Sequence, residues 1–114
     1  MKKINLAITG CMGRMGQQLI KSSKSDKKFK LVALTENRII NKKINGIRPD
    51  LNTENAFKKA NLIIDFTVPK CTFEVLKIAA KLKKRVVIGT TGFSKKEENL
   101  IKKWDWKKSS QQYF

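Results

Sequence analysis

The sequence predicts an α/β fold built on a doubly wound parallel sheet, and three observations support that class. Short apolar segments of the kind that form strands buried on both faces recur along the chain. Segments with helical periodicity separate them, so that strand and helix alternate as in right-handed βαβ crossovers. In addition, 114 residues with 40% hydrophobic content suffice for one core and one domain.

The first half of the chain supplies two predicted strands and one well-marked helix. Residues 4–9 form a mostly apolar strand candidate, and residues 31–35 form the next one. Between them, apolar side chains at three- and four-residue spacing predict a helix over 13–24, namely Met12, Met15, Leu19 and Ile20. Residues 37–52 are rich in Asn and Lys and contain glycine and proline, so we expect a surface loop there.

The second half repeats the alternation. A weak helical pattern covers 53–60, and strand candidates follow at 62–66 and 86–88. Between these strands, an apolar stripe predicts a helix over 72–83, formed by Phe73, Val75, Leu76, Ala79 and Leu82. A last helix is predicted from a capping box and the apolar residues after it, at Ser94, Glu97, Leu100, Ile101 and Trp104.

The charge balance is strongly basic, with 26 basic against 9 acidic residues and a net charge of +17. Such a surface attracts phosphorylated ligands and nucleic acid. The lysines are spread along the whole chain, which favours a lysine-coated surface over a specific nucleic-acid site. No segment approaches the roughly 20 apolar residues of a membrane span, and the N-terminus lacks the apolar region of a secretory signal. We therefore expect a cytoplasmic chain with no membrane partner and no specific nucleic-acid partner; the sequence indicates no oligomeric state.

The residue types exclude two kinds of chemistry. The sequence contains no histidine and only two cysteines, Cys11 and Cys71. A Cys/His metal site and a Ser-His or Cys-His nucleophile pair are therefore excluded, and we assign no metal ligand and no catalytic residue. We expect the two cysteines to face each other across one crevice, as small packing residues and not as a redox pair.

Three glycines mark the junction between the first strand and the first helix. The segment Gly10-Cys-Met-Gly-Arg-Met-Gly16 has glycine at every third position. Glycines there allow a sharp turn and the close approach of a pyrophosphate, whose charge is met by N–H groups at the helix N-terminus. Met12 stands where the commoner Gly-x-Gly-x-x-Gly pattern has its second glycine. A tight turn with close helix packing is the structural alternative.

An acidic residue, Glu36, closes the second predicted strand twenty positions after Gly16. A carboxylate at this place accepts hydrogen bonds from ribose hydroxyls and favours NAD(H) over a cofactor with a 2′-phosphate. Arg38 and the surrounding lysines favour the phosphate, unless Arg38 is simply a solvated loop residue. The predicted cofactor is therefore a dinucleotide, NAD(P)H, without a choice between its two forms.

Two more segments end predicted strands at the edge where open α/β sheets bind ligands. They are Asp65-Phe-Thr-Val-Pro69 and Gly89-Thr-Thr-Gly-Phe93. In the second, the hydroxyls of Thr90 and Thr91 offer hydrogen-bond donors to a planar amide such as nicotinamide. Either segment is alternatively a plain turn.

Together, the glycine segment, Glu36, the Asp65–Pro69 segment with Thr72, and the Gly89–Phe93 segment resemble the N-terminal, Rossmann-like domain of the 4-hydroxy-tetrahydrodipicolinate reductase family. These are NAD(P)H-dependent oxidoreductases of bacterial lysine (diaminopimelate) biosynthesis, and the resemblance runs from about residue 2 to residue 103. It implies contacts to the pyrophosphate, the adenosine ribose and the nicotinamide, made respectively by Gly10, Cys11, Met12, Gly13, Arg14 and Met15, by Glu36, and by Gly89, Thr90 and Thr91. Where the family commonly has an arginine after the acidic residue, this chain has Asn37.

The resemblance ends before the chain does. The family continues with a strand, a further cofactor loop and a substrate domain that holds a His-His pair, a catalytic lysine and a Ser-Gly-Thr clamp, and residues 104–114 match none of these. We therefore expect a dinucleotide-binding domain over 1–103 and a divergent polar tail over 104–114. The sheet is expected to be truncated, with no strand after the last helix and no second domain.

Two hypotheses about function follow. In the first, the chain is the cofactor-binding half of a reductase and has no turnover of its own. In the second, it is a non-catalytic basic module that binds a nucleotide or nucleic acid.

Overall fold

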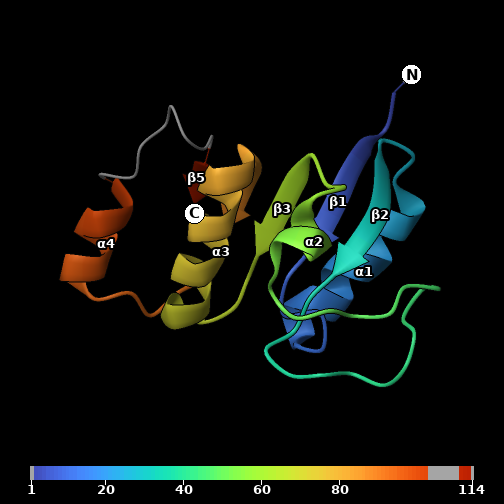
Figure 1. The fold of residues 1–114 in the computed structure, drawn as a ribbon, viewed down its shortest axis with the longest axis horizontal. Coiled ribbons are helices and arrows are strands. Elements are labelled where there is room, and N and C mark those ends of the chain that lie inside the picture. The colour runs from blue at the N-terminus through green and yellow to red at the C-terminus, as the bar shows by residue number, and fades with distance from the viewer. Residues whose placement is uncertain (1, 103–110, 114) are drawn as a thin grey trace.

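The computed structural model describes residues 2–102 and 111–113, and a five-stranded sheet forms its centre. All neighbouring strands run parallel, in the order β2-β1-β3-β4-β5 (Figure 1). The strands are β1 Ile4–Ile8, β2 Phe29–Leu34, β3 Leu62–Asp65, β4 Arg85–Ile88 and β5 Gln111–Tyr113. The predicted parallel α/β class is confirmed.

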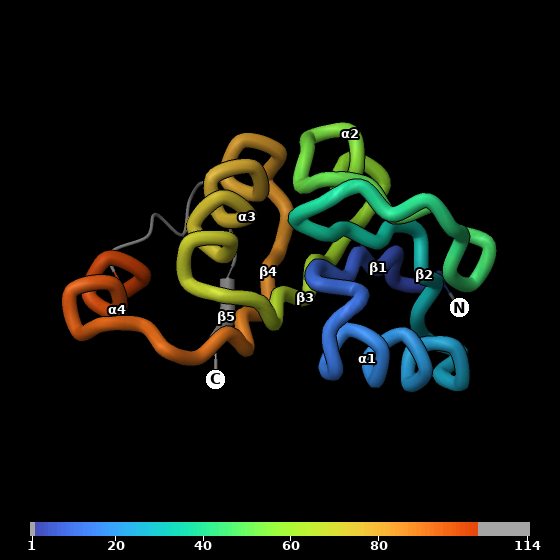
Figure 2. The backbone as a smooth tube through the Cα atoms, turned by 90° about the horizontal axis from the view of Figure 1, so that it is seen from below, coloured from blue at the N-terminus to red at the C-terminus, as the bar shows by residue number. Residues whose placement is uncertain are grey.

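Helices cover both faces of this sheet, as Figure 2 shows. One face packs against α1, through a buried cluster of Ile20 with Leu6, Ile8 and Leu34. The other face packs against α3 and α4, through a cluster that includes Leu76, Ile101, Ile63 and Val86. The four helices are α1 Arg14–Ser25, α2 Glu54–Phe57, α3 Pro69–Leu82 and α4 Lys95–Lys102. Because the crossovers lie on opposite faces, the predicted doubly wound arrangement is also confirmed.

The structure moves one helix start and organises one predicted loop. α3 begins at Pro69, three residues before the predicted start, because proline fits the first helical position, where its missing N–H is not needed. Within the predicted 37–52 loop, Ile44 and Ile47 exchange backbone hydrogen bonds of 2.8 and 3.0 Å around an Asn45-Gly46 turn. Both turn residues have positive φ, which is the geometry that Asn-Gly favours in two-residue hairpins.

The prediction that no strand follows the last helix is wrong. β5 pairs in parallel with β4, with Val86 opposite Gln111 and Ile88 opposite Tyr113. The polar sequence of this segment concealed the strand, because a sheet ladder is made by backbone groups and a polar edge segment can still supply them. Trp104 and the rest of 103–110, together with Phe114, lie outside the described residues. The division of the chain at residue 103 therefore stays a prediction.

No helix among residues 2–102 and 111–113 is long and apolar enough to cross a membrane. Within the same residues, no group of three or more His, Cys, Asp or Glu is placed to hold a metal ion.

Candidate functional site

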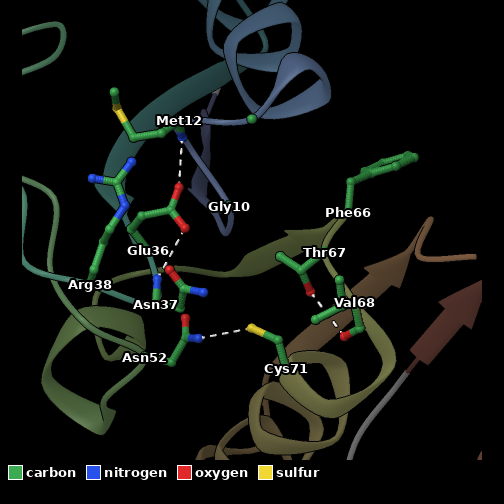
Figure 3. A pocket seen from close by; sticks show the side chains of 11 residues that line it. Gly10, Met12, Glu36, Asn37, Arg38, Asn52, Phe66, Thr67, Val68 and Cys71 are labelled. Carbon is green, nitrogen blue, oxygen red and sulfur yellow. Dashed lines mark hydrogen bonds between the residues drawn. The ribbon is translucent and has the colours of Figure 1, made fainter.

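A cleft of about 440 Å³ opens at the carboxyl ends of β1, β2 and β3. β1 and β3 are neighbours in the sheet, but the helices that follow them, α1 and α3, lie on opposite faces, so the cleft occupies a topological switch point. Figure 3 shows the wall formed by Met12, Glu36 and Arg38 and the opposite wall formed by Thr67, Val68 and Cys71. The full lining is Gly10, Met12, Gly13, Glu36, Asn37, Arg38, Asn52, Phe66, Thr67, Val68 and Cys71.

Two of the three glycines in the β1–α1 turn are required by the backbone. Gly10 has a φ of +59°, and a Cβ on it would lie 2.8 Å from Thr67 Cγ2. A Cβ on Gly16 would lie 2.1 Å from the carbonyl oxygen of Gly10, so this glycine allows α1 to pack against the turn. The predicted structural alternative, a tight turn with close helix packing, is therefore realised at these two positions.

Gly13 differs from the other two glycines. It lines the cleft, has an ordinary φ of −77°, and a Cβ on it would meet only the Gly10 carbonyl oxygen, at 3.4 Å. The fold would therefore tolerate a side chain at this position. A side chain at Gly13 would instead fill the open space in front of the N-terminus of α1.

Most backbone N–H groups of the turn are already engaged. The N–H of Cys11 donates to the Thr35 carbonyl oxygen at 3.1 Å, and the N–H of Gly13 donates to the Gly10 carbonyl oxygen at 3.0 Å. The N–H of Met12 donates to Glu36 Oε2 at 2.9 Å. By contrast, the N-cap residue Gly13 provides no side-chain acceptor for the first turn of α1, which begins at Arg14. An anion in the cleft would therefore be met by the first N–H groups of α1, those of Arg14 and Met15.

The Glu36 carboxylate lies in the cleft, where the sequence placed it. Its Oε2 accepts from Met12 N–H, and its Oε1 accepts from Asn37 N–H at 3.0 Å. Each oxygen keeps a second lone pair for a ligand hydroxyl. Figure 3 shows the Arg38 guanidinium beside this carboxylate, on the Met12 side. The structure thus brings one anionic and one cationic side chain to the same end of the cleft.

The two cysteines do not face each other across the cleft, which corrects the expectation from sequence. Cys11 has no exposed surface and packs with Leu6, Ile8 and Ile20, so only its backbone belongs to the turn. Burial, followed by the charge of Glu36, raises the pKa of the Cys11 thiol to about 11. Cys71 lies in the first turn of α3 and lines the cleft, and its Sγ accepts from Asn52 Nδ2 at 3.1 Å. Burial raises the pKa of the Cys71 thiol as well.

The predicted nicotinamide turn does not line this cleft. A Cβ on Gly89 would lie 1.9 Å from Phe66 Cε1, so the Phe66 ring packs directly on that glycine. Thr90 is buried, and its hydroxyl lies 3.2 Å from Asp65 Oδ2. Thr91 is exposed. A cofactor contact at these three residues stays a prediction.

Three residues of the cleft, Phe66, Thr67 and Val68, lie in the Asp65–Pro69 segment that the sequence placed at the ligand-binding edge. Sequence reasoning assigned no ligand contact to the two asparagines of the lining, Asn37 and Asn52, because their residue types alone carry no signal of one. Asn52 lies at the end of a long loop, which only the fold brings to α3.

The fold and the cleft define a class. A glycine turn between a parallel strand and a helix, at the switch point, with a carboxylate from the end of the next strand, is the arrangement of a dinucleotide-binding α/β domain. The model of the family described as dihydrodipicolinate reductase, N-terminus, matches residues 4–110. The chain belongs to this family, whose N-terminal domain binds NAD(P)H, so the predicted resemblance is confirmed.

Known proteins similar to this chain carry the name of the same reductase. The 4-hydroxy-tetrahydrodipicolinate reductase of Pelagibacter ubique (strain HTCC1062) is 74% identical over 104 residues, which are 91% of this chain and 40% of the relative. The reductase of the same name from Buchnera aphidicola subsp. Acyrthosiphon pisum (strain Tuc7) is 41% identical over 119 residues, 93% of this chain and 44% of the relative. The chain thus spans about two-fifths of the length of these relatives.

Among solved structures, dipicolinate-bound dihydrodipicolinate reductase from Paenisporosarcina sp. TG-14 has the same fold. The TM-score is 0.69 at 24% identity, over 87% of this chain and 42% of that one. This likeness shows the fold alone.

Proposed function

We propose that this chain is the cofactor-binding domain of a 4-hydroxy-tetrahydrodipicolinate reductase and binds NAD(P)H in the cleft between the β1–α1 turn, Glu36 and the β3–α3 turn. The observation that carries the proposal is Gly13. The fold tolerates a side chain there, yet the glycine leaves open space in front of the α1 N-terminus. A ligand that needs close backbone approach explains that glycine, whereas packing does not.

The residues of the cleft fit the parts of the cofactor. Its pyrophosphate would lie against the first N–H groups of α1, at Arg14 and Met15, where no side chain caps the helix. The adenosine ribose would lie at Glu36, whose remaining lone pairs accept from its hydroxyls. Bound NAD(P)H would supply a hydride, and the role of the residues of this chain would be to bind and orient the cofactor.

The charges in the same cleft favour little difference in affinity between NADH and NADPH. Glu36 repels a 2′-phosphate, while Arg38 beside it and the net charge of +17 attract one. At an exposed site these terms are screened over about 8 Å at physiological ionic strength. We therefore propose that NADH and NADPH bind with similar affinity, and that replacing Arg38 by glutamine weakens NADPH more than NADH. Arg48→Gln, which removes an exposed arginine outside the cleft, is the matched control.

Calorimetric titration of the purified chain tests the proposal through Gly13→Val. We expect wild-type binding with a dissociation constant at or below the millimolar range, and a loss of about 10–100-fold in Gly13→Val, because the valine keeps the pyrophosphate from its charge-assisted hydrogen bonds. The far-UV circular dichroism should not change, since the new Cβ makes only one contact, at 3.4 Å.

Gln18→Val is the control, because it adds the same side chain at an exposed position of α1 outside the cleft. It should bind as the wild type does. A wild-type chain without detectable binding of either cofactor at millimolar concentration would overturn the proposal.

A further inference from the structure

One buried carboxylate in the described part of the chain has no assigned role. Asp65 ends β3 and has no exposed surface. Four threonine hydroxyls converge on its two oxygens. Oδ1 accepts from Thr9 at 2.5 Å and from Thr67 at 2.8 Å, while Oδ2 accepts from Thr72 and, at 3.2 Å, from Thr90. A carboxylate has acceptors only, so these hydroxyls satisfy it with their protons.

The four hydroxyls come from four places along the carboxyl edge of the sheet. Thr9 directly precedes the glycine turn, and Thr67 lies in the β3–α3 turn. Thr72 is in the first turn of α3, and Thr90 follows β4. Asp65 therefore ties together the ends of three neighbouring strands and the start of one helix. Burying a carboxylate costs free energy. The four donors offset that cost only when the β1–α1, β3–α3 and β4–α4 turns stay together.

Thr67 connects this network to the cleft. Its hydroxyl donates to Asp65, and its backbone N–H donates to Thr90 Oγ1 at 2.9 Å, so that both its side chain and its backbone are held in place. Its Cγ2 is the nearest atom to the position a Cβ on Gly10 would take, at 2.8 Å, so Thr67 abuts the glycine turn. A shift of Thr67 would change the cleft directly, because Thr67 and Gly10 both line it.

We propose that Asp65 is a positioning residue. Through the four hydroxyls it holds the β1–α1, β3–α3 and β4–α4 turns in the arrangement that binds the dinucleotide, and it does not touch the ligand itself. This inference rests on the proposed function for its ligand. Its physical content is preorganisation, since a cleft that is competent for only a fraction of the time loses affinity by that fraction.

Thr72→Val and Thr72→Ser test the proposal as a pair, because Thr72 is buried, donates to Asp65 and does not line the cleft. Valine keeps the volume of threonine and removes the hydroxyl, whereas serine keeps the hydroxyl and removes a methyl group. We expect Thr72→Val to weaken NADH binding about tenfold, which corresponds to the loss of one hydrogen bond to a charged group, and Thr72→Ser to stay within about twofold of the wild type. If Thr72 served packing only, serine would be the worse variant, and that order would overturn the proposal.

Amide hydrogen exchange provides a measurement that needs no ligand. In Thr90→Val the Thr67 amide loses its acceptor, so its exchange should accelerate, while the Thr9 amide, which donates to the Ile64 carbonyl oxygen at 3.1 Å, should keep its protection. Asp65→Asn should accelerate amide exchange in all three turns more than in α1. Unchanged exchange at Thr67 in both variants would overturn the positioning role. Absence of NADH binding by the wild type, with accelerated exchange at Thr67, would instead overturn the proposed function alone.

Discussion

The two thiols of the chain differ in what reagents can reach them. Cys11 is fully buried between β1, β2 and α1, and its pKa of about 11 keeps it protonated at neutral pH. Cys71 is half-buried and lines the cleft, and burial raises its pKa above the ordinary value of 9.0. Because the thiolate is the reactive form, a raised pKa lowers the reactive fraction at any given pH.

Alkylation by iodoacetamide should therefore modify Cys71 and spare Cys11. The Cys71 rate should keep rising as the pH passes 9.0, where a thiol of ordinary pKa is half ionised, because the raised pKa moves the midpoint to higher pH. NADH in the cleft should slow the reaction, and Cys71→Ser should abolish it. Peptide mass spectrometry measures both sites. Equal modification of Cys11, or a plateau of the Cys71 rate below pH 9.0, would contradict this account.

At the scale of residues, the sequence predicted which side chain would line the cleft better than it predicted which side chains contact one another. Glu36 was placed correctly at the cleft because its position after a strand is a matter of spacing along the chain. The four hydroxyls around Asp65 were not foreseen, since they are brought together by three separate crossovers. The burial of the Cys11 side chain was equally hidden, because a turn residue points inward or outward according to a backbone geometry that composition does not encode.

At the scale of elements, the β1–α1 turn carries two separate requirements. Gly16 lets α1 pack on the turn, since a Cβ there would approach the Gly10 carbonyl oxygen to 2.1 Å and Cys11 Cα to 2.8 Å. Gly13 leaves the cleft open, and its nearest atom is 3.4 Å from the position of a Cβ. Gly16 is therefore required for packing, whereas packing does not require Gly13, which is the residue that the proposed function assigns to the ligand.

Stability measurements should separate these requirements. Gly16→Ala should lower the free energy of unfolding by about 1–3 kcal/mol, because the backbone must move to relieve the overlap. Gly13→Ala should cost at most about 1 kcal/mol, since alanine is a poorer N-cap than glycine but meets no close atom. Urea denaturation followed by circular dichroism gives both values. Equal costs for the two variants would show that the turn is not packed as described.

The elements themselves were largely predictable, because strand and helix follow from local periodicity. β1 to β4 and the helices lie within a few residues of the predicted ranges, apart from α2, which is shorter than its weak pattern, and the earlier start of α3 at Pro69. β5 was missed because a backbone ladder can form from a polar segment. The predicted ligand contact of the β4–α4 turn stays a prediction. The packing of Phe66 on Gly89 and the contact of Thr90 with Asp65 were not predictable, because only tertiary packing decides them.

At the scale of the whole molecule, the proposed function assigns only cofactor binding to this chain. Hydride transfer requires an acceptor held close to the nicotinamide, and such positioning is worth about 7–11 kcal/mol of the barrier. The sequence contains no histidine to hold or protonate an acceptor, and the chain spans about two-fifths of the length of relatives that carry the name of the reductase. We propose that the 114-residue chain on its own binds the cofactor without turnover, and a measurement decides this.

A chimera tests this division of labour. The chain would replace the matched 40% of the Pelagibacter ubique reductase, to which it is 74% identical over 104 residues. We expect the chimera to oxidise NADH or NADPH in the presence of enzymatically generated 4-hydroxy-tetrahydrodipicolinate, and the same chimera with Gly13→Val to lose that activity. The 114-residue chain alone should stay at the background rate in the same spectrophotometric assay. Turnover by the isolated chain that Gly13→Val abolishes would place catalysis within it. A folded chimera that binds cofactor yet remains inactive would show that this domain no longer presents the nicotinamide to a substrate.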